Sequence, residues 1–146
     1  MSFTITQKQV EDYIYNGKFE KIKFLKELGY DFTQNNMFIR YAASNGHLEI
    51  VKYLKEECGC DPKVEDNQPM KKAASYGHLE VVKYLIEECE CDPEIARQNT
   101  SNEKIIEYLD SLKEVERSET SAKEQSEMNT KEQIKTKLNE ILELLN

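Results

Sequence analysis

The sequence predicts an all-α protein built as a short solenoid of stacked repeats, and two observations lead to this prediction. First, a stretch of 13 residues occurs twice, as AASNGHLEIVKYL at residues 42–54 and as AASYGHLEVVKYL at residues 73–85. The copies are 31 positions apart, and self-similarity at such a period is typical of stacked repeats. Second, the 146 residues are 33% charged and only 38% hydrophobic. This is little apolar material for one large core, but a solenoid needs less because each layer is buried only against its neighbours.

Each copy is expected to form two helices around a turn glycine. Gly46 and Gly77 interrupt the pattern, and the apolar residues that follow them cover a wide helix face, as a helix packed on two neighbours requires. Pro62 and Pro93 end each unit because proline cannot continue a helix. The predicted helices lie at residues 37–44, 48–57, 69–75 and 79–88.

Atypical copies of the repeat are expected at both ends of the stack. NGKFEKIKFL at residues 16–25 aligns with NGHLEIVKYL at residues 45–54, so residues 1–32 form an N-terminal cap whose outer layer should be more polar. NEKIIEYL at residues 102–109 aligns with HLEVVKYL at residues 78–85, but seven residues are missing before it. We interpret it as a shortened C-terminal cap, with Thr100 and Glu103 as a capping box.

The remainder of the chain is expected to be separate from a repeat domain at residues 1–112. Residues 113–129 are rich in Glu, Lys, Ser and Thr and are either a charged linker or a solvated helix. Residues 130–146 are predicted to form an amphipathic helix, with Thr130 and Gln133 as its capping box. Its apolar face comprises Ile134, Leu138, Ile141, Leu142 and Leu145. This face either folds back over an exposed end of the stack or forms a two-heptad seam for self-association or a partner helix.

The pattern Ala-Ala-x-x-Gly-His-Leu-Glu-(Ile/Val)-Val-Lys-Tyr-Leu, followed by Cys-Asp-Pro, resembles the ankyrin repeat. The resemblance is strong over residues 36–93, weaker over 7–31 and 95–112, and absent after residue 113. It implies helix–turn–helix layers stacked into a curved solenoid, with a concave face and loop tips that bind other proteins. The variant with Val-Lys-Tyr-Leu in its second helix is similar to ankyrin proteins of large DNA viruses and some protists.

The candidate partner contacts centre on residue pairs that differ between the two copies although the frame does not: Arg40-Tyr41 becomes Lys71-Lys72, and Ser44-Asn45 becomes Ser75-Tyr76. The resemblance implies that positions just before the turn glycine face the concave groove, and Tyr76 is the strongest candidate because tyrosine is enriched at interface hot spots. Asn36 and Asn67 lie at loop ends. The alternative is that all of these are ordinary surface residues. The predicted set is Asn36, Arg40, Tyr41, Ser44, Asn45, Asn67, Lys71, Lys72, Ser75 and Tyr76.

Catalytic and metal sites are not expected. Cys58, Cys60, Cys89 and Cys91 have the inventory of a zinc site, but equivalent positions in stacked layers lie about 10 Å apart, too far for Zn–S bonds of about 2.3 Å. His47 and Cys58 lie at opposite ends of one helix, about 16 Å apart at about 1.5 Å per residue. We therefore predict structural cysteines, histidines that satisfy free N–H groups at helix starts, no metal and no cofactor.

The net charge of −8 argues against nucleic-acid binding, which depends on neutralising phosphates with Lys and Arg. No apolar run approaches 18 residues, so no membrane span is expected. Free cysteines and the absence of a signal-peptide pattern indicate the cytoplasm, or the nucleus. We predict a non-enzymatic module that binds another protein through the groove and loop ends, with the acidic surface steering it toward a basic partner. The alternative is a self-assembling scaffold, monomeric or weakly self-associating through the C-terminal helix.

Overall fold

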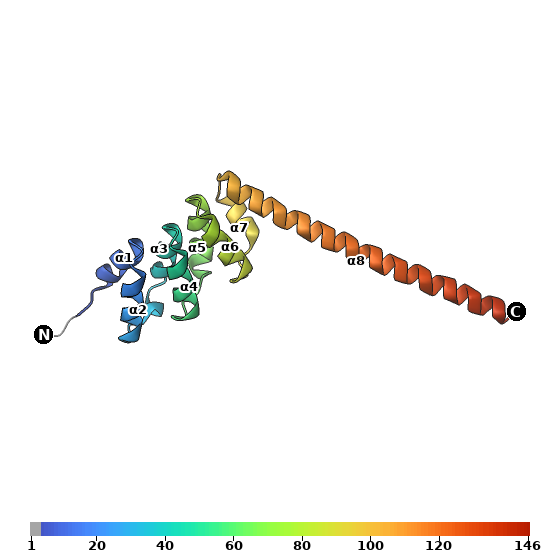
Figure 1. The fold of residues 1–146 in the computed structure, drawn as a ribbon, viewed down its shortest axis with the longest axis horizontal. Helices are drawn as coiled ribbons and strands as arrows, with labels where there is room; N and C mark the ends of the chain where they lie inside the picture. Colours follow the sequence, from blue (N-terminus) through green and yellow to red (C-terminus); the bar gives the residue numbers. More distant parts are fainter. Residues whose placement is uncertain (1–3) are drawn as a thin grey trace. The chain divides into compact units, whose positions relative to one another are not determined.

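The computed structural model describes residues 4–146, and these residues form helices, turns and loops without a strand. The first three residues, part of the segment expected not to be a signal peptide, lie outside the described residues. Figure 1 shows successive helix pairs lying side by side, which confirms the predicted all-α repeat fold. The helices are α1 (Gln7–Tyr15), α2 (Phe19–Glu27), a 3-10 turn η1 (Phe32–Gln34), α3 (Met37–Ser44), α4 (Leu48–Glu56), α5 (Val64–Ser75), α6 (Leu79–Glu87), α7 (Pro93–Gln98) and α8 (Glu103–Leu144).

The layers pack in two rows. The first helices, α1, α3, α5 and α7, form a continuous row, and the second helices, α2, α4 and α6, form a looser one. Small side chains favour close approach of α3, α5 and α7, and Ala42, Ala73 and Ala96 are completely buried. In the second row the Tyr84 hydroxyl donates a hydrogen bond of 2.7 Å to Oε1 of Glu56 and so links α6 to α4.

The turn inside each layer requires a glycine. Gly46 has φ of 72°, and the N–H of His47 donates back to the carbonyl of Ala42 at 3.0 Å, which closes a Schellman motif at the end of α3. Gly77 has φ of 78° and closes α5 in the same way, through His78 N–H and the carbonyl of Ala73. Residues with a side chain are strained in this left-handed region.

Helix α5 contains a break near its start. Glu65, Asp66 and Asn67 have φ of 51°, 58° and 60°, so one left-handed turn precedes the right-handed part. Such a conformation is unfavourable for residues other than glycine, and a run of three is unusual. Pro69 then lies in the first turn of the right-handed part, as the sequence predicted, where its missing N–H costs nothing.

The fourth layer is shortened as expected, but its capping residue differs from the prediction. Asn102, rather than Thr100, precedes α8, and its Oδ1 accepts hydrogen bonds from the N–H groups of Lys104 and Ile105 at 3.1 and 3.3 Å. Thr100 instead accepts from the N–H of Asn102 at 3.1 Å. The prediction failed because both Thr100 and Asn102 are residue types that cap helices, and the sequence pattern does not fix the helix start to within two residues.

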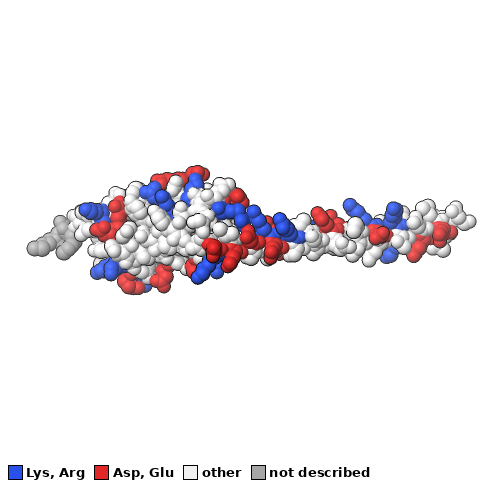
Figure 2. All heavy atoms as spheres, turned by 90° about the horizontal axis from the view of Figure 1, so that it is seen from above, with Lys and Arg blue, Asp and Glu red and all other residues white. Residues whose placement is uncertain are grey.

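Helix α8 is continuous from Glu103 to Leu144, so residues 113–129 are helical and no new helix begins at Thr130. The expected capping box there is wrong, because the Thr130 hydroxyl donates to the carbonyl of Ser126 at 2.9 Å in the helix interior. The chain forms two compact units that meet within this helix, between Glu107 and Tyr108. Figure 2 shows both basic and acidic side chains along α8.

Candidate functional site

A surface hollow lies where the C-terminal ends of α1, α3 and α5 come together. Six of the ten predicted partner contacts line it, joined by one residue that sequence reasoning did not select, Tyr15 of α1. In the alignment of the copies Tyr15 occupies the position of Ser44, and this correspondence was the available signal. The lining residues are Tyr15, Arg40, Tyr41, Ser44, Asn45, Lys72 and Tyr76.

The hollow is aromatic and cationic. Tyr15 and Tyr76 are each 62% exposed, although large apolar surfaces normally tend to be buried. The Lys72 ammonium lies 6.0 Å from the centre of the Tyr76 ring, and the Arg40 guanidinium lies 5.6 Å from the Tyr41 ring. Both distances are within the range of cation–π contacts, so the charges are held beside aromatic faces.

The left-handed turn supplies carboxylates to two of the predicted cationic residues. Nη1 of Arg40 lies 2.8 Å from Oε2 of Glu65, and Nζ of Lys71 lies 2.6 Å from Oδ2 of Asp66. Lys71 does not line the hollow. Lys72, by contrast, forms no ion pair among the described residues.

The smaller polar residues of the predicted set have mixed roles. The Ser44 hydroxyl and the Asn45 amide both donate to the carbonyl of Tyr41, at 3.0 and 2.8 Å, and so satisfy the end of α3. Ser75 is exposed beside the hollow without lining it. Asn36 precedes α3 and Asn67 ends the left-handed turn, so the two loop-end residues lie outside the hollow.

The two histidines connect adjacent layers, which differs from the predicted role. Neither side chain caps its own helix. Nε2 of His47 bonds the carbonyl of Tyr15 at 2.9 Å, and Nε2 of His78 bonds the carbonyl of Ser44 at 2.9 Å. A carbonyl can only accept, so Nε2 carries the proton in both rings. The prediction failed because the partner is a backbone group more than 30 positions away, which no local pattern reveals.

The four cysteines are free and buried, and burial raises the pKa of each thiol. The effect is largest for Cys60, whose pKa is raised to about 12, and for Cys91, whose pKa is raised to about 11. The Cys60 thiol also donates to the carbonyl of Phe32 at 3.6 Å. Within residues 4–146, no group of three or more His, Cys, Asp or Glu side chains is placed to hold a metal ion.

An apolar hollow at the N-terminal end of the stack was also missed. Phe24 is 56% exposed and Leu28 is 67% exposed, although this outer layer was expected to be more polar. The alignment of the copies could have predicted this aromatic residue on the outer layer, since Phe24 aligns with Tyr53 of the next copy. Its lining residues are Thr4, Ile5, Gln9, Tyr13, Lys21, Phe24, Leu25, Leu28, Gly29 and Tyr30.

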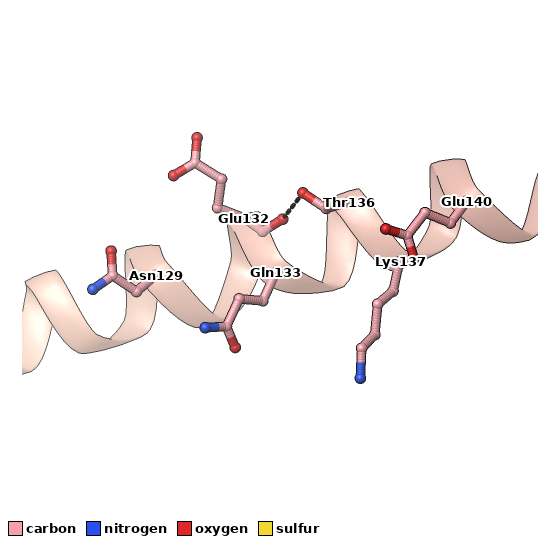
Figure 3. A pocket seen from close by; sticks show the side chains of 6 residues that line it. All are labelled: Asn129, Glu132, Gln133, Thr136, Lys137 and Glu140. Carbon is pink, nitrogen blue, oxygen red and sulfur yellow. Dashed lines mark hydrogen bonds between the residues drawn. The ribbon is translucent and has the colours of Figure 1, made fainter.

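Helix α8 also carries open surface features. The side chains of Ile134, Leu138, Ile141 and Leu142 are 54–57% exposed, and Leu145 is 77% exposed. Asn129, Glu132, Gln133, Thr136, Lys137 and Glu140 border a shallow hollow further round the helix. Figure 3 shows these side chains spreading apart, with one hydrogen bond, from the Thr136 hydroxyl to the carbonyl of Glu132. Such an arrangement has no convergent groups for chemistry.

Comparison with known proteins gives one match. A family model described as ankyrin repeats, in three copies, matches residues 12–99. No curated protein and no solved structure matches the chain. In the part of the chain that the structure describes, every helix is too short or too polar to cross a membrane.

Proposed function

The chain belongs to the ankyrin-repeat family, and on that premise we propose that it is a non-enzymatic module that binds another protein through the hollow on its first-helix row. Ankyrin repeats are generally protein–protein interaction modules. The observation that carries the proposal is the meeting of three tyrosines and two cations from three different layers in one hollow.

The energetics of interfaces favour this surface over the others. Tyrosine and arginine are enriched among residues that dominate binding energy, because they bring large contact area and directional polar groups. Tyr76 lies beside Lys72 and 6.5 Å from the His78 ring, and its 62% exposure leaves most of its ring available for contact with a partner. Asn36, Asn67, Lys71 and Ser75 lie outside the hollow and would contribute only to a partner that extends beyond it.

The test is an affinity capture with wild-type protein and two variants. Tyr76→Ala should reduce recovery of the specific partner, whereas Phe24→Ala, which removes a comparably exposed aromatic ring outside the hollow, should leave it unchanged. Circular dichroism would check that both variants stay folded. Unchanged recovery with Tyr76→Ala would contradict the assignment of the hollow.

A second candidate function is self-assembly through the C-terminal helix. The observation that favours it is the set of exposed apolar side chains spaced by four, three and four positions, Ile134, Leu138, Ile141 and Leu145. Leu138→Glu should then convert an oligomer to a monomer in size-exclusion chromatography with light scattering, while Val115→Glu, at an equally exposed apolar position, should not. A wild-type chain that stays monomeric at high concentration would exclude this candidate.

The proposed setting is the cytoplasm, or the nucleus. Four unpaired thiols support a reducing compartment, where such cysteines persist.

A further inference from the structure

The charges in the hollow point to the chemistry of the segment that it binds. Arg40 and Lys72 are its charged lining residues, and no carboxylate lines it. This local balance is opposite in sign to the net charge of −8. At physiological salt the interaction of exposed charges is screened over about 8 Å, so the groups inside the hollow decide what is bound at contact.

One of the two cations, Arg40, already forms an ion pair with a carboxylate of the protein itself. Glu65 Oε2 lies 2.8 Å from Arg40, and the Arg40 and Glu65 side chains are 25% and 43% exposed. Exposed ion pairs contribute little to stability, so an incoming carboxylate can replace Glu65 at small cost. The Glu65 carboxylate therefore lies where a carboxylate of a partner would bind Arg40.

The second cation is available without displacement. Lys72 is exposed and contacts the face of Tyr76 at 6.0 Å, with no ion pair in residues 4–146. Lys71, its neighbour in sequence, is instead held by Asp66 outside the hollow. Glu65 and Asp66 of the left-handed turn thus form ion pairs with Arg40 and Lys71. In the described part of the chain Lys72 is left without such a partner, beside the exposed Tyr76.

We propose that the hollow binds an acidic segment of the partner protein, with one carboxylate on Lys72, a second on Arg40 in exchange for Glu65, and adjoining apolar groups on Tyr76. The proposal rests on the proposed function of this hollow. It replaces the expectation of a basic partner, which depended on net charge alone. Complementary charges at an interface act chiefly by selecting the right partner and excluding wrong ones.

The experiment selects short random peptides, displayed on phage, against the immobilised full-length chain. Selected peptides should be enriched in Asp and Glu, and their affinities can be measured by fluorescence polarisation. Lys72→Gln should weaken binding about tenfold, and Glu65→Gln should strengthen it about threefold because Arg40 is released from its internal partner. Lys55→Gln on α4, which makes the same charge change as Lys72→Gln but outside the hollow, should leave affinity within about twofold.

The possible outcomes separate this inference from the proposed function. Neutral or basic peptides whose binding is lost in Tyr76→Ala would overturn the acidic specificity and leave the protein-binding hollow in place. Weaker binding in Glu65→Gln would overturn the exchange at Arg40. Selected peptides insensitive to Tyr76→Ala, or no selected peptides, would overturn both. A single-stranded oligothymidylate that binds more tightly than the acidic peptides and depends on Lys72 would assign the site to nucleic acid instead.

Discussion

At the scale of single residues, the contact between a turn glycine and the histidine of the next layer holds the stack in register. A Cβ built on Gly46 would lie 2.5 Å from Nδ1 of His78, and one built on Gly17 would lie 2.8 Å from Cε1 of His47. The same ring also bonds the preceding layer through Nε2, so it has little room to move aside. At Gly77 the neighbour is Asn102, which takes the histidine's place in the last layer.

Gly46→Ala should therefore destabilise the fold more than an equivalent change at an open turn. We expect a loss of about 2 to 4 kcal/mol, from left-handed strain together with overpacking against His78. Gly29→Ala is the matched control, because Gly29 also has positive φ but nothing lies within 4 Å of its built Cβ, and strain alone should cost about 1 to 2 kcal/mol. Urea unfolding measures the free energy of unfolding of both variants. Equal losses would show that the His78 ring moves aside without cost.

A substitution at Glu90 should increase stability, in contrast to the glycine substitutions. Glu90 stands where the preceding copy has Gly59, and it has φ of 53° without being a glycine. Glu90→Gly should raise the free energy of unfolding by about 1 kcal/mol because the left-handed strain disappears. Thermal and urea unfolding would measure it. A lower stability would mean that the Glu90 side chain makes contacts that outweigh the strain.

At the scale of elements, the ends of α4 and α6 are covered by cysteines that serve as small apolar residues. Cys58 and Cys89 lie just beyond α4 and α6, and Cys60 and Cys91 lie in the loops that follow, with all four at most 8% exposed. A buried free thiol behaves as a small hydrophobic group. The raised pKa follows from this burial, since a thiolate would lose its hydration.

Alkylation by iodoacetamide should consequently be slow in the native protein. The reagent attacks the thiolate, and a thiol with raised pKa remains protonated until higher pH. At pH 8 Cys60 and Cys91 should react much more slowly than in urea-unfolded protein. Their native rates should keep rising with pH until it reaches about 12 for Cys60 and about 11 for Cys91, whereas the unfolded rates level off near the ordinary thiol pKa of about 8.5. Mass spectrometry of the modified peptides distinguishes the sites. Native rates equal to unfolded rates at pH 8 would contradict the burial.

Helix α8 differs from the other helices in how it is supported. From residue 113 to residue 146 every side chain is exposed, so this part depends on intrinsic helix propensity and not on packing. Amide hydrogen exchange should therefore be faster over residues 113–133 than in α4 and α6, because an unsupported helix opens locally. Hydrogen-exchange mass spectrometry provides the comparison. Protection as strong as in α4 would mean that another surface covers the helix.

At the scale of the whole molecule, stability should come from contacts between neighbouring layers. In a solenoid each layer contacts only its neighbours, so remote parts affect the stack little. We propose that residues 1–112 contain all the contacts on which the stability of the repeat domain depends. This segment retains the buried Ile105 and Leu109 of α8.

A chain ending at residue 112 should accordingly unfold at nearly the same temperature as the full chain. Differential scanning calorimetry gives both midpoints, and a difference within about 3 °C corresponds to less than about 1 kcal/mol for a domain of this size. A markedly lower midpoint for the truncated chain would indicate that the C-terminal helix covers and stabilises the stack. This measurement decides between the two roles left open for residues 130–146.

The sequence by itself determined the repeat frame. The 31-residue period, the turn glycines and the positions of the buried alanines and cysteines could be read from it, because burial in a stacked repeat follows the local helical pattern. The boundaries of α3, α4 and α6 were predicted to within about two residues, the usual uncertainty in such boundaries. Helix α5 begins at Val64, five residues before the predicted start, and the helix expected to begin at residue 130 is the last part of α8. The long α8 was left ambiguous because its charged middle has neither an apolar stripe nor a glycine or proline to mark an end.

Only the tertiary structure decided which distant groups meet. Tyr15 joins Tyr76 in the hollow, Glu65 pairs with Arg40, and His78 bonds the carbonyl of Ser44. These partners come from different layers or from the turn between them, and their contacts depend on distances across the stack rather than on spacing along the chain. The same reason explains why the charge of the hollow is opposite to that of the whole chain: composition counts every residue, whereas a binding surface is made only of those that the fold brings together.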